Sequence, residues 1–194
     1  HLPRALVNIS LQSAPGVAMA KLFESLLIVG AVLILLRFFK IPLSDVFLKP
    51  GNLKKSILLG LPLFFLMYSL SMGMAIDGNY AGFLLQSSPW LLIFCLSNAL
   101  MEELLFRGLL LKELRSLLGK KTAILLTSIV FTAAHLQVSY APDPLLFLSG
   151  LFILAILWGV LVLKTDNLIA ATLFHAGADT LIFAGIVANL GGTV

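Results

Sequence analysis

The stretch LSNALMEELLFRGLLLKELR, residues 96–115, begins as an apolar run and then places charged side chains among leucines. Glu102 and Glu103 are adjacent, and Arg107 lies four residues after Glu103. Residues four apart share a face of a helix, so Glu103 and Arg107 can neutralise each other. Glu102 points about 100° away from Glu103 and cannot use that contact equally well. One glutamate is therefore expected to be structural, which leaves the other available for chemistry.

The rest of the chain is equally apolar. Its 194 residues have a mean hydropathy of +1.07, and only 11% of them are charged, whereas soluble domains contain about 25% charged residues. This composition indicates an integral membrane protein. The length suits one domain over residues 1–194. The single cysteine, Cys95, excludes an intrachain disulfide.

Long apolar segments predict the fold. A helix that crosses a bilayer needs about 20 mostly apolar residues. About six segments meet this requirement, at approximately 17–39, 56–76, 89–111, 122–138, 144–163 and 167–190. The sequence therefore predicts an all-α fold, a polytopic transmembrane helix bundle with about six spans.

The basic residues are concentrated in alternate connections between these segments. Counted together with Arg37 at the end of the first segment, the connections after the first, third and fifth segments hold ten of the 13 Lys and Arg residues, and those after the second and fourth hold none. This alternation is the positive-inside pattern, so the basic loops are expected to be cytoplasmic. Because the charge is spread over separate loops, we expect the lipid bilayer and no nucleic acid as a partner.

Several ionisable residues lie well inside the expected spans. A charge at the centre of a bilayer costs about 2.5–3.5 kcal/mol on insertion scales, so such residues face the protein interior or a water-filled cavity and usually serve function. Phe131 precedes His135 by four residues, and His175 precedes Asp179 by four, so each pair shares a helix face. The candidate site residues are Glu102, Glu103, Arg107, His135, His175 and Asp179.

Three motifs appear in order on the third, fourth and sixth spans: Glu-Glu-x-x-x-Arg at 102–107, Phe-x-x-x-His at 131–135 and His-x-x-x-Asp at 175–179. With these motifs the chain resembles the CAAX protease and bacteriocin-processing family, also called Abi, of intramembrane endopeptidases. The region that carries the motifs, about 88–190, covers roughly half of the chain.

The resemblance implies roles for the candidate residues. Glu102 would be the general base that acts with His135 on a water, and His175 with Asp179 would stabilise the oxyanion. Glu103 and Arg107 would hold the helix that bears the base. The substrate would be a membrane-anchored or lipidated peptide or protein. Prenyl-protein proteases of this family usually have Asn where this chain has Asp179, which favours a bacterial-type member in the bacterial cytoplasmic membrane.

Other interpretations stay open at this point. Two histidines and nearby carboxylates could hold zinc with one open position. No His-Glu-x-x-His helix is present, so a mechanism without a metal or other cofactor is favoured. Buried Glu, His and Asp also occur in proton-coupled transporters. A non-catalytic membrane immunity or binding protein on the same scaffold is the remaining alternative.

Overall fold

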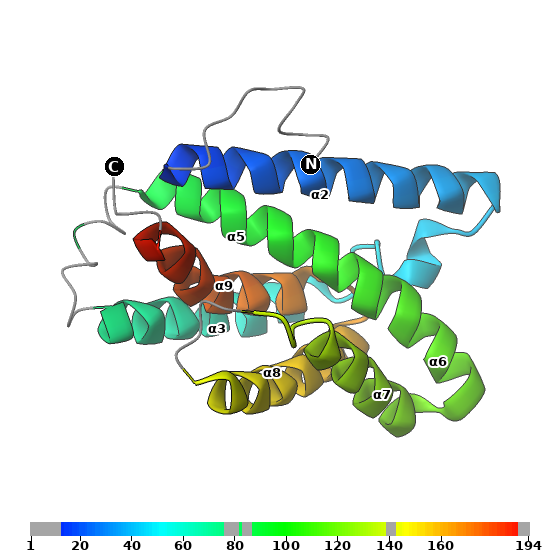
Figure 1. Cartoon of the computed structure of the whole chain (residues 1–194). Helices are drawn as coiled ribbons and strands as arrows, with labels where there is room; N and C mark the ends of the chain where they lie inside the picture. Colours follow the sequence, from blue (N-terminus) through cyan, green and yellow to red (C-terminus); the bar gives the residue numbers. More distant parts are fainter. Residues whose placement is uncertain (1–12, 76–81, 83–86, 139–142, 190–194) are drawn as a thin grey trace.

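The computed structural model describes residues 13–75, 82, 87–138 and 143–189, and these residues form helices and connecting turns without a strand (Figure 1). The all-α polytopic bundle is thereby confirmed. In chain order the elements are α2 (Ala14–Phe38), η1 (Leu43–Val46), α3 (Leu53–Ala75), α5 (Ser88–Glu103), η3 (Leu104–Leu110), α6 (Leu111–Leu118), α7 (Lys120–Ala133), α8 (Pro144–Thr165) and α9 (Ile169–Asn189).

Local sequence signals determine where several helices begin. Ser13 caps α2 by accepting a hydrogen bond from the backbone N–H of Gly16 at 3.2 Å. Asp143 does the same for α8, where its Oδ1 accepts from the N–H of Leu146 at 3.0 Å. Both helices have proline in their first turn, where its missing N–H would be unpaired anyway.

Five of the described helices are long and apolar enough to cross a membrane: α2, α3, the continuous rod from α5 through η3 to α6, α8 and α9. Large apolar side chains such as Ile34, Leu58 and Leu145 point outward, while polar residues including Glu103 and Arg107 are buried. This distribution fits a bundle with lipid around it and a polar site within it.

The expected fourth span, 122–138, is the exception. It forms α7, which has 14 residues and ends at Ala133. At 1.5 Å per residue α7 is about 21 Å long, shorter than the hydrocarbon core of about 30 Å. The correction matters for the site, because the chain leaves the helix just before His135. His135 therefore lies on a turn instead of within a helix.

The buried residues form two apolar clusters, and the charged residues lie where these meet. One cluster includes Ala99 of α5 and Ala176 of α9. The other includes Leu104 of η3 and Phe174 of α9. On the rod that begins with α5, Glu102 and Glu103 lie between the two clusters. On α9, His175 lies between the same two clusters. Because α5 and α9 pack against each other, these polar groups lie at the same depth in the bundle.

Close packing of α9 against α3 holds His175 in place. Gly177 faces α3 so closely that a Cβ built on it would lie 2.6 Å from the carbonyl oxygen of Phe64. The small residues around Gly177 therefore permit a close approach of the two helices.

Candidate active site

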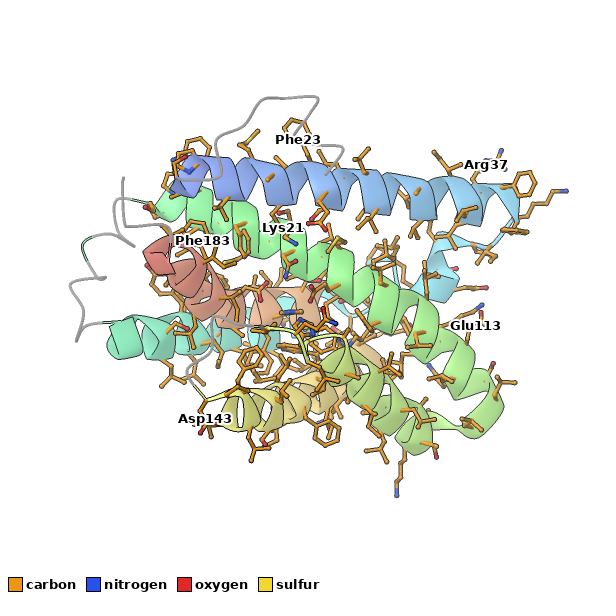
Figure 2. The ribbon with its side chains drawn as sticks, viewed as in Figure 1. Lys21, Phe23, Arg37, Glu113, Asp143 and Phe183 are labelled. Atoms are coloured by element: carbon orange, nitrogen blue, oxygen red, sulfur yellow. The ribbon has the colours of Figure 1, made fainter. Side chains whose placement is uncertain are left out.

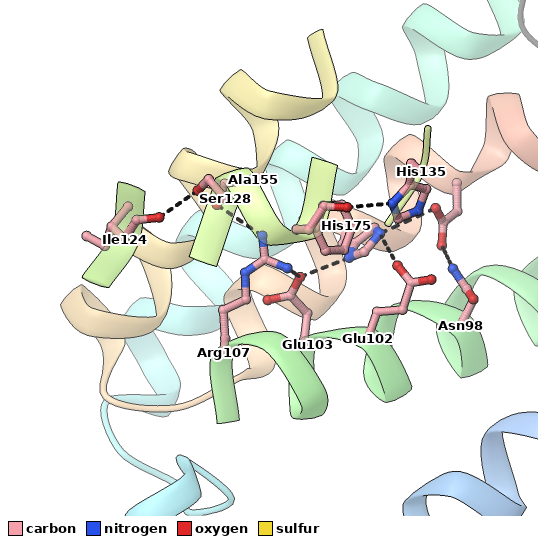
Figure 3. A network of polar contacts seen from close by, with 11 residues as sticks. Asn98, Glu102, Glu103, Arg107, Ile124, Ser128, His135, Ala155 and His175 are labelled. Carbon is pink, nitrogen blue, oxygen red and sulfur yellow. Dashed lines mark hydrogen bonds and ion pairs between the residues drawn. The ribbon is translucent and has the colours of Figure 1, made fainter. Parts of the chain in front are cut away.

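The rod formed by α5 and η3 presents four polar side chains to the interior of the bundle (Figure 3). Asn98 and Glu102 are four residues apart and share one face, whereas Glu103 and Arg107 are four apart on the neighbouring face. Arg107 lies within η3, a π-helical segment of seven residues. Such wider turns occur frequently at functional sites.

Glu103 and Arg107 form the expected ion pair, and both side chains are fully buried. Arg107 Nη1 donates to Glu103 Oε1 at 3.0 Å, and Nη2 donates to the carbonyl oxygen of Ala155 on α8 at 3.1 Å. The guanidinium also lies 4.6 Å from the centre of the Phe131 ring. These contacts tie the rod to α7 and α8.

Glu103 has a second contact that helical spacing could not predict. Its Oε1 lies 2.9 Å from Nδ1 of His175 on α9, a buried hydrogen bond. A carboxylate only accepts, so Nδ1 carries the hydrogen and the other ring nitrogen, Nε2, is directed away from Glu103. Trp158 stacks on the same imidazole with ring centres 3.9 Å apart and planes 12° apart. Glu103 and Trp158 together determine the orientation of His175.

Two further carboxylates approach Nε2 of His175. Glu102 Oε2 and Asp179 Oδ1 each lie 3.5 Å from it, which is an ion-pair distance longer than a good hydrogen bond. The expected proximity of His175 and Asp179 is therefore present, but the short bond to the ring comes from Glu103. Asp179 instead accepts a hydrogen bond from Asn98, whose Nδ2 lies 3.0 Å from its Oδ2.

His135 follows α7 in a turn that determines its tautomer. Its Nδ1 lies 2.8 Å from the carbonyl oxygen of Phe131, one helical turn earlier. A carbonyl oxygen accepts, so Nδ1 carries the hydrogen of a neutral ring and Nε2 retains a lone pair. In the Phe-x-x-x-His motif, the backbone carbonyl of Phe131 thus holds the His135 ring. The ring of Phe131 packs against both His135 and His175.

A cavity of about 240 Å³ connects these groups. Glu102, His135, His175 and Asp179 all line it, so four of the six predicted site residues share one space. Glu103 and Arg107 do not line the cavity and lie behind His175. The remaining lining residues are Lys21, Phe94, Asn98, Phe147, Leu151, Ile182 and Ile186.

Sequence reasoning missed Asn98, Trp158 and the position of Lys21. Asn98 had a signal, because it is a polar residue in an apolar run and lies one turn before Glu102. Trp158 had none, because nothing in α8 indicates which helix its ring faces. Lys21 pairs with Glu24 at 2.7 Å, as its spacing suggests, and it also reaches the cavity from α2 (Figure 2).

The donor atoms of the site are largely engaged with one another. Within the described residues, no group of three or more His, Cys, Asp or Glu side chains is arranged to hold a metal ion. Nδ1 of each histidine already has a partner, Glu103 for His175 and the Phe131 carbonyl for His135. Any metal ligand from these rings would have to be Nε2.

Comparison with protein families matches residues 84–181 to the type II CAAX prenyl endopeptidase Rce1-like family. The chain belongs to this family. The matched region contains all three motifs and covers half of the chain. Searches of curated proteins and of solved structures found no match.

Family membership decides among the functions that the sequence left open. The protein is an intramembrane endopeptidase of the CAAX protease type, and it is an integral membrane protein. The resemblance inferred from the three motifs is thereby confirmed. A transporter or a non-catalytic immunity protein is not supported.

Proposed function

We propose that this endopeptidase hydrolyses a peptide bond of a membrane-anchored substrate with Glu102 and His135 as the groups that activate water. One observation carries the proposal: Glu102, His135, His175 and Asp179, from three separate parts of the chain, line a single cavity inside the bundle. The cavity is large enough for several water molecules, each of which occupies about 30 Å³ in the liquid. A hydrolytic water therefore has room between these groups.

The proposed reaction assigns the proton and the electron pair to specific atoms. A water oxygen attacks the carbonyl carbon of the scissile bond, and the water proton passes to the carboxylate of Glu102. The electron pair of the carbonyl double bond moves to its oxygen, which becomes an oxyanion. When the intermediate collapses, the C–N bond breaks and the leaving nitrogen takes the proton from Glu102. Nε2 of His135, with its lone pair, accepts a hydrogen bond from the attacking water.

Glu103 and Arg107 act in this proposal as positioning residues. Glu103 Oε1 accepts hydrogen bonds from both Arg107 and His175, so the pair holds the imidazole through its Nδ1 side. When Nε2 of His175 carries a proton, it can donate to the oxyanion. Preorganised donors in a site with little water stabilise such a charge more than they would in bulk water.

The experiment compares cleavage by the wild type and two variants in lipid vesicles. The substrates are a prenylated peptide ending in C-a-a-X and an unprenylated peptide with a membrane anchor. We expect Glu102→Gln and His135→Gln each to lower kcat at least 100-fold, because general acid–base groups contribute about 10²–10⁴-fold. The preferred peptide identifies the substrate class, which we propose to be lipidated.

Glu113→Gln is the matched control. Glu113 is a glutamate on α6, exposed and paired with Lys112, and it lies at the far end of the rod from the cavity (Figure 2). We expect this variant to cleave at the wild-type rate. Cleavage by Glu102→Gln at the wild-type rate would refute the assignment of the base.

The same assay tests the metal-free mechanism that we favour. Treatment with a zinc chelator is expected to leave cleavage unchanged, because the carboxylate of Glu102 performs each proton transfer described above. Loss of activity that added zinc restores would replace this mechanism with a zinc-dependent one. The bacterial cytoplasmic membrane as the location stays a prediction from the resemblance and from Asp179.

A further inference from the structure

Asp179 places a carboxylate beside His175, where the proposed reaction needs a hydrogen-bond donor to the oxyanion. Asp179 lies beside Nε2 of His175, at 3.5 Å, and both residues line the cavity. An ionised carboxylate has no hydrogen to donate and would repel a negative oxygen. Stabilisation of an oxyanion beside His175 therefore needs a second donor from another residue.

Asn98 supplies a donor of the right kind in this position. It lines the cavity, it is 8% exposed, and its Nδ2 donates to Asp179 Oδ2 at 3.0 Å. The partner is a carboxylate, which only accepts, so the NH2 end of the amide must face Asp179. That NH2 group has two hydrogens, and the bond to Asp179 uses one of them.

We propose that Asn98 is a catalytic residue that donates its second N–H hydrogen to the oxyanion, next to Nε2 of His175; this inference rests on the proposed function. In this arrangement Asp179 is a positioning residue. Its Oδ2 fixes the rotation of the Asn98 amide, and its Oδ1 faces the imidazole.

The spacing along α5 places the proposed oxyanion donor, Asn98, next to the proposed base, Glu102. Asn98 lies one turn before Glu102 on the same face, and four residues correspond to a rise of about 6 Å. The proposed base and the proposed oxyanion donor would thus approach the scissile carbonyl from neighbouring turns of one helix. Figure 3 shows both side chains directed to the same side of α5, toward His175 and His135.

The first test is the substitution Asn98→Ala in the prenylated-peptide assay. Removal of one oxyanion donor typically lowers kcat about 10²–10³-fold. We expect a loss of about 100-fold in kcat with little change in KM, because the oxyanion exists only during the reaction. Asn98→Asp should lose as much, since the new carboxylate cannot donate. A kcat within threefold of the wild type for Asn98→Ala would overturn the proposal.

A compensating substitution separates chemistry from structure. Asp179→Asn places a carboxamide beside His175, and this group can donate to the oxyanion itself. We expect kcat of the double variant Asn98→Ala with Asp179→Asn to be at least tenfold higher than kcat of Asn98→Ala alone. Failure of this rescue, with both proteins folded, would show that Asn98 only supports the structure.

A binding measurement adds a readout that does not require turnover. A peptide phosphinate has a tetrahedral anionic centre that resembles the intermediate of amide hydrolysis. We expect Asn98→Ala to weaken phosphinate binding about 100-fold while binding of the uncleaved peptide changes little. Equal weakening of both ligands would contradict the assignment.

Ser97→Ala serves as the control on the adjacent residue. The Ser97 hydroxyl donates to the carbonyl of Ile93 in its own helix at 2.6 Å and does not line the cavity. Glu102→Gln run in parallel keeps the two proposals distinct. If Glu102→Gln abolishes cleavage and Asn98→Ala does not, only the Asn98 assignment fails, whereas full activity of Glu102→Gln removes the proposed function itself.

Discussion

At the scale of single residues, Glu103 decides how the site is held together. One of its oxygens accepts hydrogen bonds from Arg107 at 3.0 Å and from His175 at 2.9 Å, and all three side chains are buried. A buried charge is costly unless it is paired, so the three residues depend on one another. Spacing of four residues made the Glu103–Arg107 pair predictable. The bond to His175 joins positions 72 residues apart, and no local pattern indicates it.

Replacement of Glu103 should therefore destabilise the protein more than an ordinary surface substitution does. In Glu103→Gln the guanidinium of Arg107 stays charged and buried without a carboxylate partner. We expect the free energy of unfolding to fall by about 3–5 kcal/mol, measured by denaturation in detergent micelles. Glu113→Gln, whose exposed partner is Lys112, should cost less than about 1 kcal/mol. Similar losses in the two variants would contradict the role given to the buried pair.

At the scale of helices, the contact between α3 and α9 sets the position of the His175 imidazole. Gly177 lies between His175 and Asp179 in sequence and faces the backbone of α3. The run of small residues made a close helix contact predictable. The identity of the partner was not predictable, because several spans are equally apolar. The length of α7 was also missed, because the apolar pattern does not show that the chain leaves the helix after Ala133 and that the His135 side chain bonds to the carbonyl oxygen of Phe131 in the last turn of α7.

A methyl group at Gly177 should disturb both the packing and the site. The Cβ of Gly177→Ala would meet the carbonyl oxygen of Phe64 at 2.6 Å, so α3 and α9 must move apart. We expect a loss of about 1–3 kcal/mol in the free energy of unfolding, together with slower cleavage. Gly150→Ala on α8 is the control, because nothing lies within 4 Å of its Cβ. An unchanged midpoint of unfolding for Gly177→Ala would show that the helices separate without cost.

At the scale of the whole molecule, the distribution of charge predicts the orientation in the membrane. The connections from α2 to α3 and from α6 to α7 lie at the same end of the bundle (Figure 1), and most of the basic residues lie in these connections or in the helix ends beside them, within residues 37–55 and 112–121. The positive-inside rule assigns this end to the cytoplasm. The cavity lies deeper in the bundle, between α2, α5, α8 and α9.

Cysteine labelling tests this orientation. In a Cys95→Ser background, Lys120→Cys places one thiol at the start of α7, and Gly82→Cys places one in the segment that joins α3 to α5. We expect a membrane-impermeable maleimide added to intact cells to label Gly82→Cys and to reach Lys120→Cys only after permeabilisation. The reverse pattern would invert the predicted topology.

The sequence by itself determined the helical fold, most of the spans and the pairs within single helices. These features are local: a bilayer requires backbone hydrogen bonds to be satisfied within each helix, and helical periodicity places residues four apart on one face. The three motifs were sufficient to indicate the family for the same reason, because each is contained in one segment.

Only the tertiary structure decided which groups meet across helices. It brought Glu103 to His175, Asn98 to Asp179 and Trp158 onto the imidazole, and it ended α7 before His135. These contacts depend on how each helix is rotated toward its neighbours. That rotation results from the packing of all the side chains together, which no single segment encodes.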